Sequence, residues 1–201
     1  MFMQDFTRLT AAFAPVALPA VARGTPVTTG LVAGTLLETR SGWHAVETLA
    51  IGDAVQTLDG GMSRIMGLHR CILRADAGAS LIRIDGGWHD ACSDVLLLPG
   101  QHVLLDTLND PQQGGAPFAM IAALALLASP GARRTSPATD VQIITPMFAD
   151  EEVVYANSGV LLHCPGLADG AGHYPENSFF PCLEATEARH FLHRRTARLA
   201  A

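Results

Sequence analysis

Residues 30–61, GLVAGTLLETRSGWHAVETLAIGDAVQTLDGG, constrain the fold of this chain more than any other stretch. Short apolar runs alternate there with turn residues, which are Ser41-Gly42, Gly52-Asp53 and Asp59-Gly60-Gly61. Tight turns need positive φ angles, and glycine adopts these without steric cost. The stretch therefore predicts a strand, a turn, one helical turn near residues 46–49, a second strand and a hairpin.

The rest of the chain continues this pattern of short strands and frequent turns. Apolar or alternating runs predict strands at 34–38, 54–58, 63–73, 80–85, 94–98, 103–105, 141–144, 152–155 and 160–163. Apolar residues at helical spacing predict a short internal helix at 117–128 and an amphipathic C-terminal helix at 183–200, while 130–140 is typical of a loop. We therefore expect a mainly-β single domain at 30–182, after a tail at 1–29 and before a helix at 183–201.

Charge and composition narrow the classes of partner and source. The chain has 201 residues and a net charge of −6, which argues against nucleic acid as a partner. All 13 basic residues are arginine, a bias that indicates a GC-rich bacterial gene. Four of these arginines (Arg189, Arg194, Arg195 and Arg198) gather near the C-terminus, where we predict a solvated helix face.

Cysteines and targeting leave several alternatives open. Cys71, Cys92, Cys164 and Cys182 allow three disulfide pairings, although a chain of this size favours buried free thiols. The first 24 residues have the length of a signal peptide, but Asp5, Pro15 and Pro19 argue against one, so a cytoplasmic or a secreted protein is possible. We expect no membrane span, because no apolar run reaches the roughly 20 residues that one needs.

Several ordered motifs resemble the bacterial Hint (hedgehog/intein) domain family. They are Gly34-Thr35, then Val46-Glu47-x-Leu49-x-x-Gly52-Asp53-x-Val55-x-Thr57, and then Asp59-Gly60-Gly61. Three later segments, DVLLLPGQHVLL (94–105), EEVVYANSGVL (151–161) and ENSFFP (176–181), are similar to the later segments of that family. The resemblance implies a compact, mostly β, horseshoe-like Hint fold.

The resemblance also implies a self-cleaving chemistry, from which this sequence departs at three places. In the family a first-position Cys or Ser attacks the preceding carbonyl, and a His protonates the scissile amide. Here Gly30 holds the first position, and Gln101 replaces the His, while His102 comes one place late. Asp150-Glu151 stands where the family has a closing His. These departures predict a degenerate domain that acts as a structural or interaction module with a protein partner.

Two other functions remain as alternatives. An active autoprocessing domain would cut near residue 29, with Thr29, Gly30, Gln101 and His102 as the candidate site residues. A small metal-binding protein would use His163, Cys164, His173 and Cys182, although His163 and Cys164 point to opposite faces if they lie on a strand. No phosphate-binding glycine pattern occurs, so we expect no organic cofactor.

The degenerate hypothesis makes one further prediction. If the scaffold is retained, Gly30→Cys combined with Gln101→His restores part of the cleavage, because these changes return the nucleophile and the proton donor.

Overall fold

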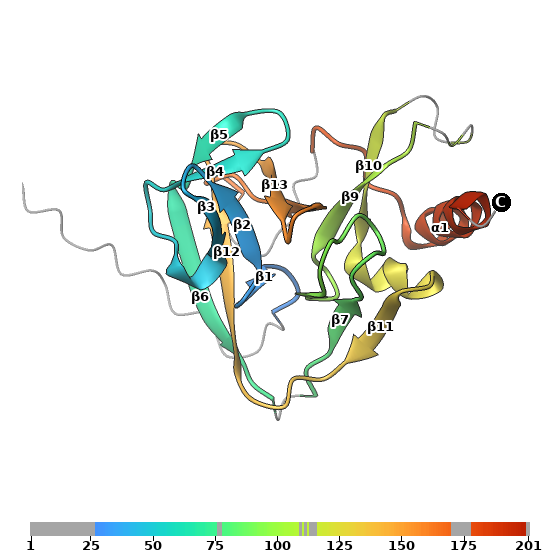
Figure 1. Ribbon diagram of the computed structural model, residues 1–201, viewed down its shortest axis with the longest axis horizontal. Coiled ribbons are helices and arrows are strands. Elements are labelled where there is room, and N and C mark those ends of the chain that lie inside the picture. Colours follow the sequence, from blue (N-terminus) through green and yellow to red (C-terminus); the bar gives the residue numbers. More distant parts are fainter. Residues whose placement is uncertain are drawn as a thin grey trace, which may run out of the picture.

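The computed structural model describes residues 27–75, 78–108, 110, 112, 116–169 and 178–199. Short antiparallel strands in these ranges form two sheets, and one α-helix follows them near the C-terminus (Figure 1). The prediction of a mainly-β domain with a C-terminal helix is therefore confirmed. Most of the predicted tail, with the candidate signal peptide, lies outside the described residues.

One sheet has six strands in the spatial order β11-β7-β8-β1-β12-β6. Its strands are β1 Leu31–Val32, β6 Gly67–Leu73, β7 Leu81–Ile84, β8 Val95–Leu97, β11 Ala132–Thr135 and β12 Val141–Met147. The short β1 lies in the middle of the sheet, where Leu31 pairs with Leu97 on one side and with Ile144 on the other. Strands from distant parts of the sequence thus hold the start of the domain.

The other sheet has eight strands, in the order β10-β9-β14-β13-β2-β4-β5 with β3 paired to β2. Their bounds are β2 Leu36–Thr39, β3 Gly42–Ala45, β4 Ala54–Thr57, β5 Gly61–Arg64, β9 His102–Asp106, β10 Phe118–Ala122, β13 Glu152–Ala156 and β14 Val160–Cys164. The predicted helical turn is the 3-10 helix η1, Val46–Thr48, and the predicted hairpin joins β4 to β5 with Thr57 opposite Gly61.

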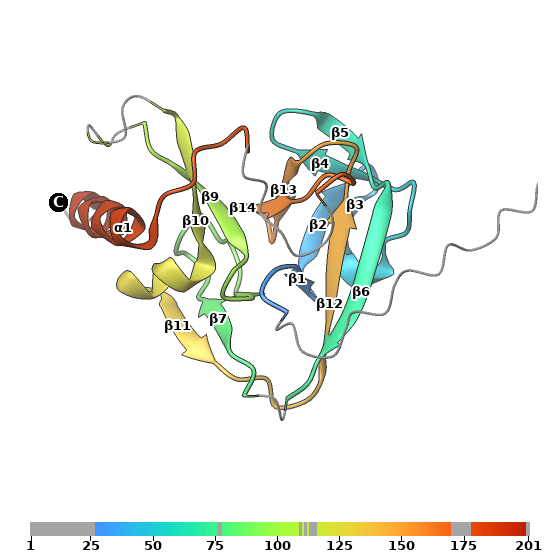
Figure 2. The same cartoon turned by 180° about the vertical axis from the view of Figure 1, so that it is seen from behind.

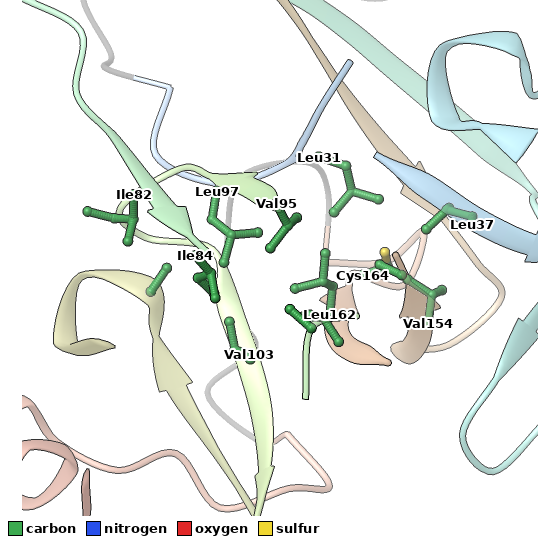
Figure 3. Packing of buried hydrophobic residues seen from close by; sticks show 14 of the residues in the cluster. Leu31, Leu37, Ile82, Ile84, Val95, Leu97, Val103, Val154, Leu162 and Cys164 are labelled. Carbon is green, nitrogen blue, oxygen red and sulfur yellow. The ribbon is translucent and has the colours of Figure 1, made fainter. Parts of the chain in front are cut away.

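Side chains from both sheets meet in one aliphatic core. Figure 3 shows Leu31, Ile82 and Leu97 of the six-stranded sheet in the same core cluster as Leu162 and Val154 of the eight-stranded sheet. Successive residues of a strand point to opposite faces, so β1 places Leu31 in this core and Val32 in a smaller buried cluster. Each buried side chain of this size contributes roughly 1.5–3 kcal/mol. The core thereby fixes the position of β1.

Three predicted elements differ from the structure. Residues 117–128 form the strand β10 followed by the 3-10 helix η3, Ala123–Ala128, because a short apolar run fits a buried strand as well as a helix. The single predicted strand at 63–73 is divided into β5 and β6, which belong to different sheets. The predicted loop at 130–140 contains β11, which pairs with β7.

Helix α1, Ala185–Leu199, packs onto the domain through Ala188, Phe191 and Leu192, all of which are buried. Two arginines of the predicted solvated face instead contact acidic residues of the body. Arg194 forms a bidentate pair with the buried Asp110, its Nε donating to Oδ1 and its Nη2 to Oδ2, and Arg195 donates to Asp90. None of the helices in the described ranges is long and apolar enough to cross a bilayer.

Candidate functional site

The peptide group that joins Thr29 to Gly30 lies just before β1, beside the start of β9. Gly30 is buried, and its φ angle of +119° is one that favours glycine. Its backbone N–H donates to the side-chain oxygen of Gln101 across 2.9 Å. The side chain that accepts the N–H of this amide is therefore that of Gln101.

The orientation of the Gln101 carboxamide follows from its partners. The side chain is 2% exposed, and its nitrogen donates to the carbonyls of His163 at 2.8 Å and His102 at 3.2 Å. If the amide were flipped, its N–H groups would face the Gly30 N–H and its oxygen would face two carbonyl oxygens. Both contacts would be repulsive, so the partners fix the orientation. Gln101 thus links the peptide group before β1 to β9 and β14.

Two side chains of β12 crowd the space beside Gly30. A Cβ atom at this position would lie 2.7 Å from Ile143 Cγ2 and 2.8 Å from Thr145 Oγ1. Both distances are shorter than ordinary van der Waals contacts, so neither a Cys nor a Ser side chain fits without movement of β12. Together with its positive φ, this crowding makes Gly30 a glycine-only position in the observed packing.

The four candidate autoprocessing residues line one small cavity. Its walls consist of Thr29, Gly30, Leu31, Gln101, His102, Thr145, Pro146, His163, Cys164 and Pro165. Just upstream, the carbonyl of Thr28 accepts the N–H of Gly100 at 2.9 Å, which holds the incoming chain against the Pro99-Gly100 turn. Thr145 and His163 were not predicted here, because only the pairing of distant strands brings them to Gly30.

Two neighbouring imidazoles face this cavity. The rings of His102 and His163 meet edge to face with their centroids 6.3 Å apart. Burial and the adjacent His163 lower the pKa of His102 to about 4. Burial also lowers the pKa of His163, although the carboxylate of Glu151, 3.2 Å away, opposes this shift. Both rings are therefore neutral at pH 7.

Glu151 occupies the region where the resemblance leads one to expect a closing histidine. Its carboxylate contacts Nε2 of His163 and accepts hydrogen bonds from the Ser178 hydroxyl and the Phe179 N–H. The structure thus supplies a histidine to this region from β14, next to Glu151 in space.

Part of the chain matches a known protein family. Residues 29–161, more than half of the chain, match the family described as Hint domain. The chain belongs to the Hint domain family. The match begins at Thr29, immediately before the peptide bond that the Gln101 side chain contacts.

The solved structures to which the chain is similar include inteins and an intein-like domain. A class 3 split intein, AceL NrdHF, is 12% identical with a TM-score of 0.49 and covers 69% of this chain and 99% of its own. The intein-like domain from Clostridium thermocellum is 14% identical, with a TM-score of 0.44 and coverages of 67% and 98%. The MchDnaB-1 intein is 16% identical, with a TM-score of 0.45 and the same coverages. No curated protein matches this chain.

The candidate metal ligands do not converge in the described part of this Hint domain. His163 faces the small cavity, whereas the thiol of Cys164 lies in the core near Leu37 and Val154 (Figure 3). Cys182 is exposed beside β10, and His173 lies outside the described residues. Among the residues that the structure describes, no group of three His, Cys, Asp or Glu side chains could hold a metal ion.

All four cysteines fall within the described ranges, and each is a free thiol. Only Cys164 is fully buried, and burial raises its pKa far above the usual range, so its thiol stays protonated. Cys71 is half-buried, whereas Cys92 and Cys182 are exposed. The expectation of free thiols agrees with the structure, but the expectation that all of them are buried is wrong.

Proposed function

We propose that this Hint domain no longer cuts its backbone between Thr29 and Gly30 and serves as a structural or interaction module. The observation that carries the proposal is the hydrogen bond from the Gly30 N–H to the Gln101 oxygen. Acyl transfer at this bond needs a nucleophile next to the carbonyl and an acid that protonates the departing nitrogen. Gly30 offers no nucleophile, and a carboxamide oxygen that accepts the N–H delivers no proton.

The surroundings of the bond support the same proposal. The two groups that could carry charge in the cavity, His102 and His163, are neutral because burial lowers the pKa of each imidazole. The nearby thiol of Cys164 is protonated and turned into the core. The site therefore presents hydrogen-bonding groups that hold the peptide in place and no reactive thiolate.

A retained autoprocessing activity is the second candidate. It is favoured by the position of Thr29, which lines the same small cavity as His102, a neutral imidazole that can accept a proton. In this alternative the Thr29 hydroxyl gives its proton to His102 and attacks the carbonyl carbon of Thr28, whose oxygen accepts the Gly100 N–H. The Thr28–Thr29 amide bond breaks, the Thr29 nitrogen takes up the proton and leaves as an amine, and water then hydrolyses the new ester. Threonine is a weak nucleophile unless a base is hydrogen-bonded to it.

The experiment that separates the two candidates is intact-mass spectrometry of the purified full chain over several days, with and without a thiol or hydroxylamine. We expect an unchanged full-length mass under every condition. A new fragment that begins at Thr29 or Gly30 would contradict the proposal. The variants Thr29→Ala and His102→Ala then show how the fragment forms. Loss of the fragment in both variants would assign the cleavage to attack by the Thr29 hydroxyl with His102 as its base.

A further inference from the structure

A second, much larger cavity lies beyond His102, between η3 and α1. Its volume is about 640 Å³, within the range of roughly 300–1,000 Å³ that is typical of small-molecule sites. One wall is the end of β10 with η3, and the other is formed by residues 182–184 with the first turn of α1. These two walls lie on the same side of the molecule in Figure 1 and Figure 2, away from β6.

The walls of this cavity are aliphatic. Eight of the lining residues are Ala122, Leu124, Ala125, Leu127, Ala128, Leu183, Ala185 and Ala188. Alanines line both walls, and their short side chains leave the space between η3 and α1 unfilled. Among the residues that the structure describes, the imidazole of His102 is the only aromatic ring in the lining. The surface therefore suits CH₂ groups better than a planar ring that needs a stacking partner.

The remaining lining residues show where a polar group would sit. They are His102, Cys182, Glu184 and Arg189. The imidazole of His102 is neutral at pH 7 because burial lowers its pKa. Cys182 is exposed as a residue, but partial burial of its thiol and the charge of Glu184 raise the pKa of that thiol. Glu184 and Arg189 are exposed and of opposite sign. The cavity thus has an uncharged interior and a rim that carries no net charge, so a ligand is not selected by its charge.

We propose that this cavity binds a single aliphatic chain, of the alkyl or fatty-acyl class, whose head group stays in water at the rim. Burial of CH₂ groups against the alanine and leucine side chains supplies the binding free energy. Residues 182–189 follow the segment that matches the Hint family, so the wall formed by α1 lies outside the matched segment. Neither wall of the cavity includes Thr29 or Gly30, so binding there is independent of cleavage at the Thr29–Gly30 bond.

Titration calorimetry with octanoate, decanoate and dodecanoate below micelle concentration tests this site on the full chain. We expect saturable binding of one chain per protein, tighter by about two- to fourfold for each added CH₂ group. Decyl glucoside, which has an uncharged head, should bind within about threefold of decanoate, since the charges of Glu184 and Arg189 oppose each other.

Substitutions that fill the cavity can be compared with a control substitution outside it. Ala128→Leu and Ala185→Leu place extra methyl groups on opposite walls, and together they should weaken dodecanoate binding at least tenfold. Ala197→Leu, an exposed alanine of α1 outside the lining, should leave it unchanged. Circular dichroism verifies that each variant is folded. Absence of saturable binding, or equal affinity in the filled and control variants, would overturn the inference.

A measurement on the unaltered protein avoids any effect of substitution on folding. On addition of dodecanoate, the methyl NMR signals of Ala125 and Ala188 should shift, whereas that of Ala197 should not. Shifts confined to other methyl groups contradict the assigned site.

Co-sedimentation with phosphatidylcholine vesicles then distinguishes a bilayer lipid from a free amphiphile as the source of the aliphatic ligand. If the unaltered protein sediments with the vesicles and the filled variant does not, the bound aliphatic chain belongs to a bilayer lipid. If neither protein sediments, the ligand is a free amphiphile.

Discussion

The backbone N–H of Gly30 donates to the side-chain oxygen of Gln101, 71 positions later in the chain, at 2.9 Å. This contact occupies the amide that a self-cleaving Hint domain would have to protonate. Because the nitrogen of the same carboxamide binds the carbonyls of His163 and His102, the bond belongs to a buried network. Its effects on stability can be measured separately from any cleavage.

Gly30 should tolerate no side chain. Gly30→Ala is expected to lower the free energy of unfolding by about 1–2 kcal/mol for the positive φ and by about 1–3 kcal/mol more for contact with Ile143 and Thr145. Gly34→Ala is the matched control, since Gly34 has a φ of +90° with nothing within 4 Å of its Cβ position. Urea unfolding measures both, and equal losses would contradict the crowding.

The same crowding corrects the expectation that Gly30→Cys with Gln101→His restores part of the cleavage. The new Cβ atom would meet Ile143 Cγ2 and Thr145 Oγ1, so the thiol could not take its place without movement of β12. We expect the double variant to be destabilised and to keep its full-length mass. A cleaved product from this variant would show that β12 yields more easily than its packing indicates.

Gln101→Leu should leave buried polar groups without partners. The Gly30 N–H and the His163 carbonyl each lose a hydrogen bond, and one unpaired buried group costs about 1–3 kcal/mol. Gln56→Leu is the control, because the half-buried Gln56 donates to the carbonyl of the adjacent Thr57. Its effect should stay within about 0.5 kcal/mol. Similar losses for both variants in urea unfolding would argue against a special role of Gln101.

The pair of Arg194 with Asp110 should fix α1 to the domain. Arg194→Ala leaves the buried Asp110 carboxylate without its bidentate partner, and we expect a loss of about 2–3 kcal/mol in unfolding free energy. Arg189→Ala is the control, because Arg189 is exposed and its guanidinium donates to the Ala185 carbonyl of its own helix. This variant should change the unfolding free energy by less than about 0.5 kcal/mol. Equal effects of the two variants would show that the pair is not needed.

The same pair predicts a pH dependence. Burial would raise the pKa of Asp110, but the hydrogen bonds and charge of Arg194 outweigh it and hold the pKa below its ordinary value. The folded state therefore favours the ionised carboxyl. Its stabilising contribution is complete above about pH 4 and is lost as the pH falls through the lower folded pKa. In urea unfolding, the difference in unfolding free energy between the unaltered protein and Arg194→Ala should shrink as the pH falls below about 4.

His102 should destabilise the fold under mild acid. The unfolded chain takes up a proton near pH 6.5, whereas burial and His163 delay protonation of folded His102 to about pH 4. Stability should therefore decrease as the pH falls from 6.5 to 4, and His102→Gln should reduce this slope by about 1 kcal/mol per pH unit. His44→Gln, which removes an exposed imidazole, is the control. An NMR titration that places the His102 pKa above 6 would contradict this prediction.

Local turn chemistry explains why many strands could be predicted. The Asp59-Gly60-Gly61 turn predicted the β4–β5 hairpin, and Gly61 has a positive φ of 65°. The resemblance of residues 30–61, 94–105 and 151–161 to the Hint family is confirmed by the family match over 29–161, whereas the resemblance of residues 176–181 lies outside that match. Turn and strand patterns depend on residues a few positions apart, so they can be recognised in short stretches of the sequence.

The surroundings of Gly30 could be predicted only in part. Gly30 and Gln101 can be noticed in the sequence as departures from what the Hint resemblance implies, but the closeness of Ile143 and Thr145 to Gly30 requires that β1 pair with β12. The approach of His163 to His102 likewise requires that β14 pair with β9. No local pattern contains such pairings, because they are selected by burial of the complete core.

Local patterns in the sequence suffice to predict a mainly-β domain that resembles the Hint family, with glycine at the position where the resemblance implies a nucleophile. The pairing of distant strands makes Gln101 the acceptor of the Gly30 N–H and leaves no space for a side chain at Gly30. Tertiary packing also makes residues 118–122 a strand and forms the cavity between η3 and α1. Strand propensity acts over a few residues, whereas hydrogen-bond partners and free space arise when distant segments pack together.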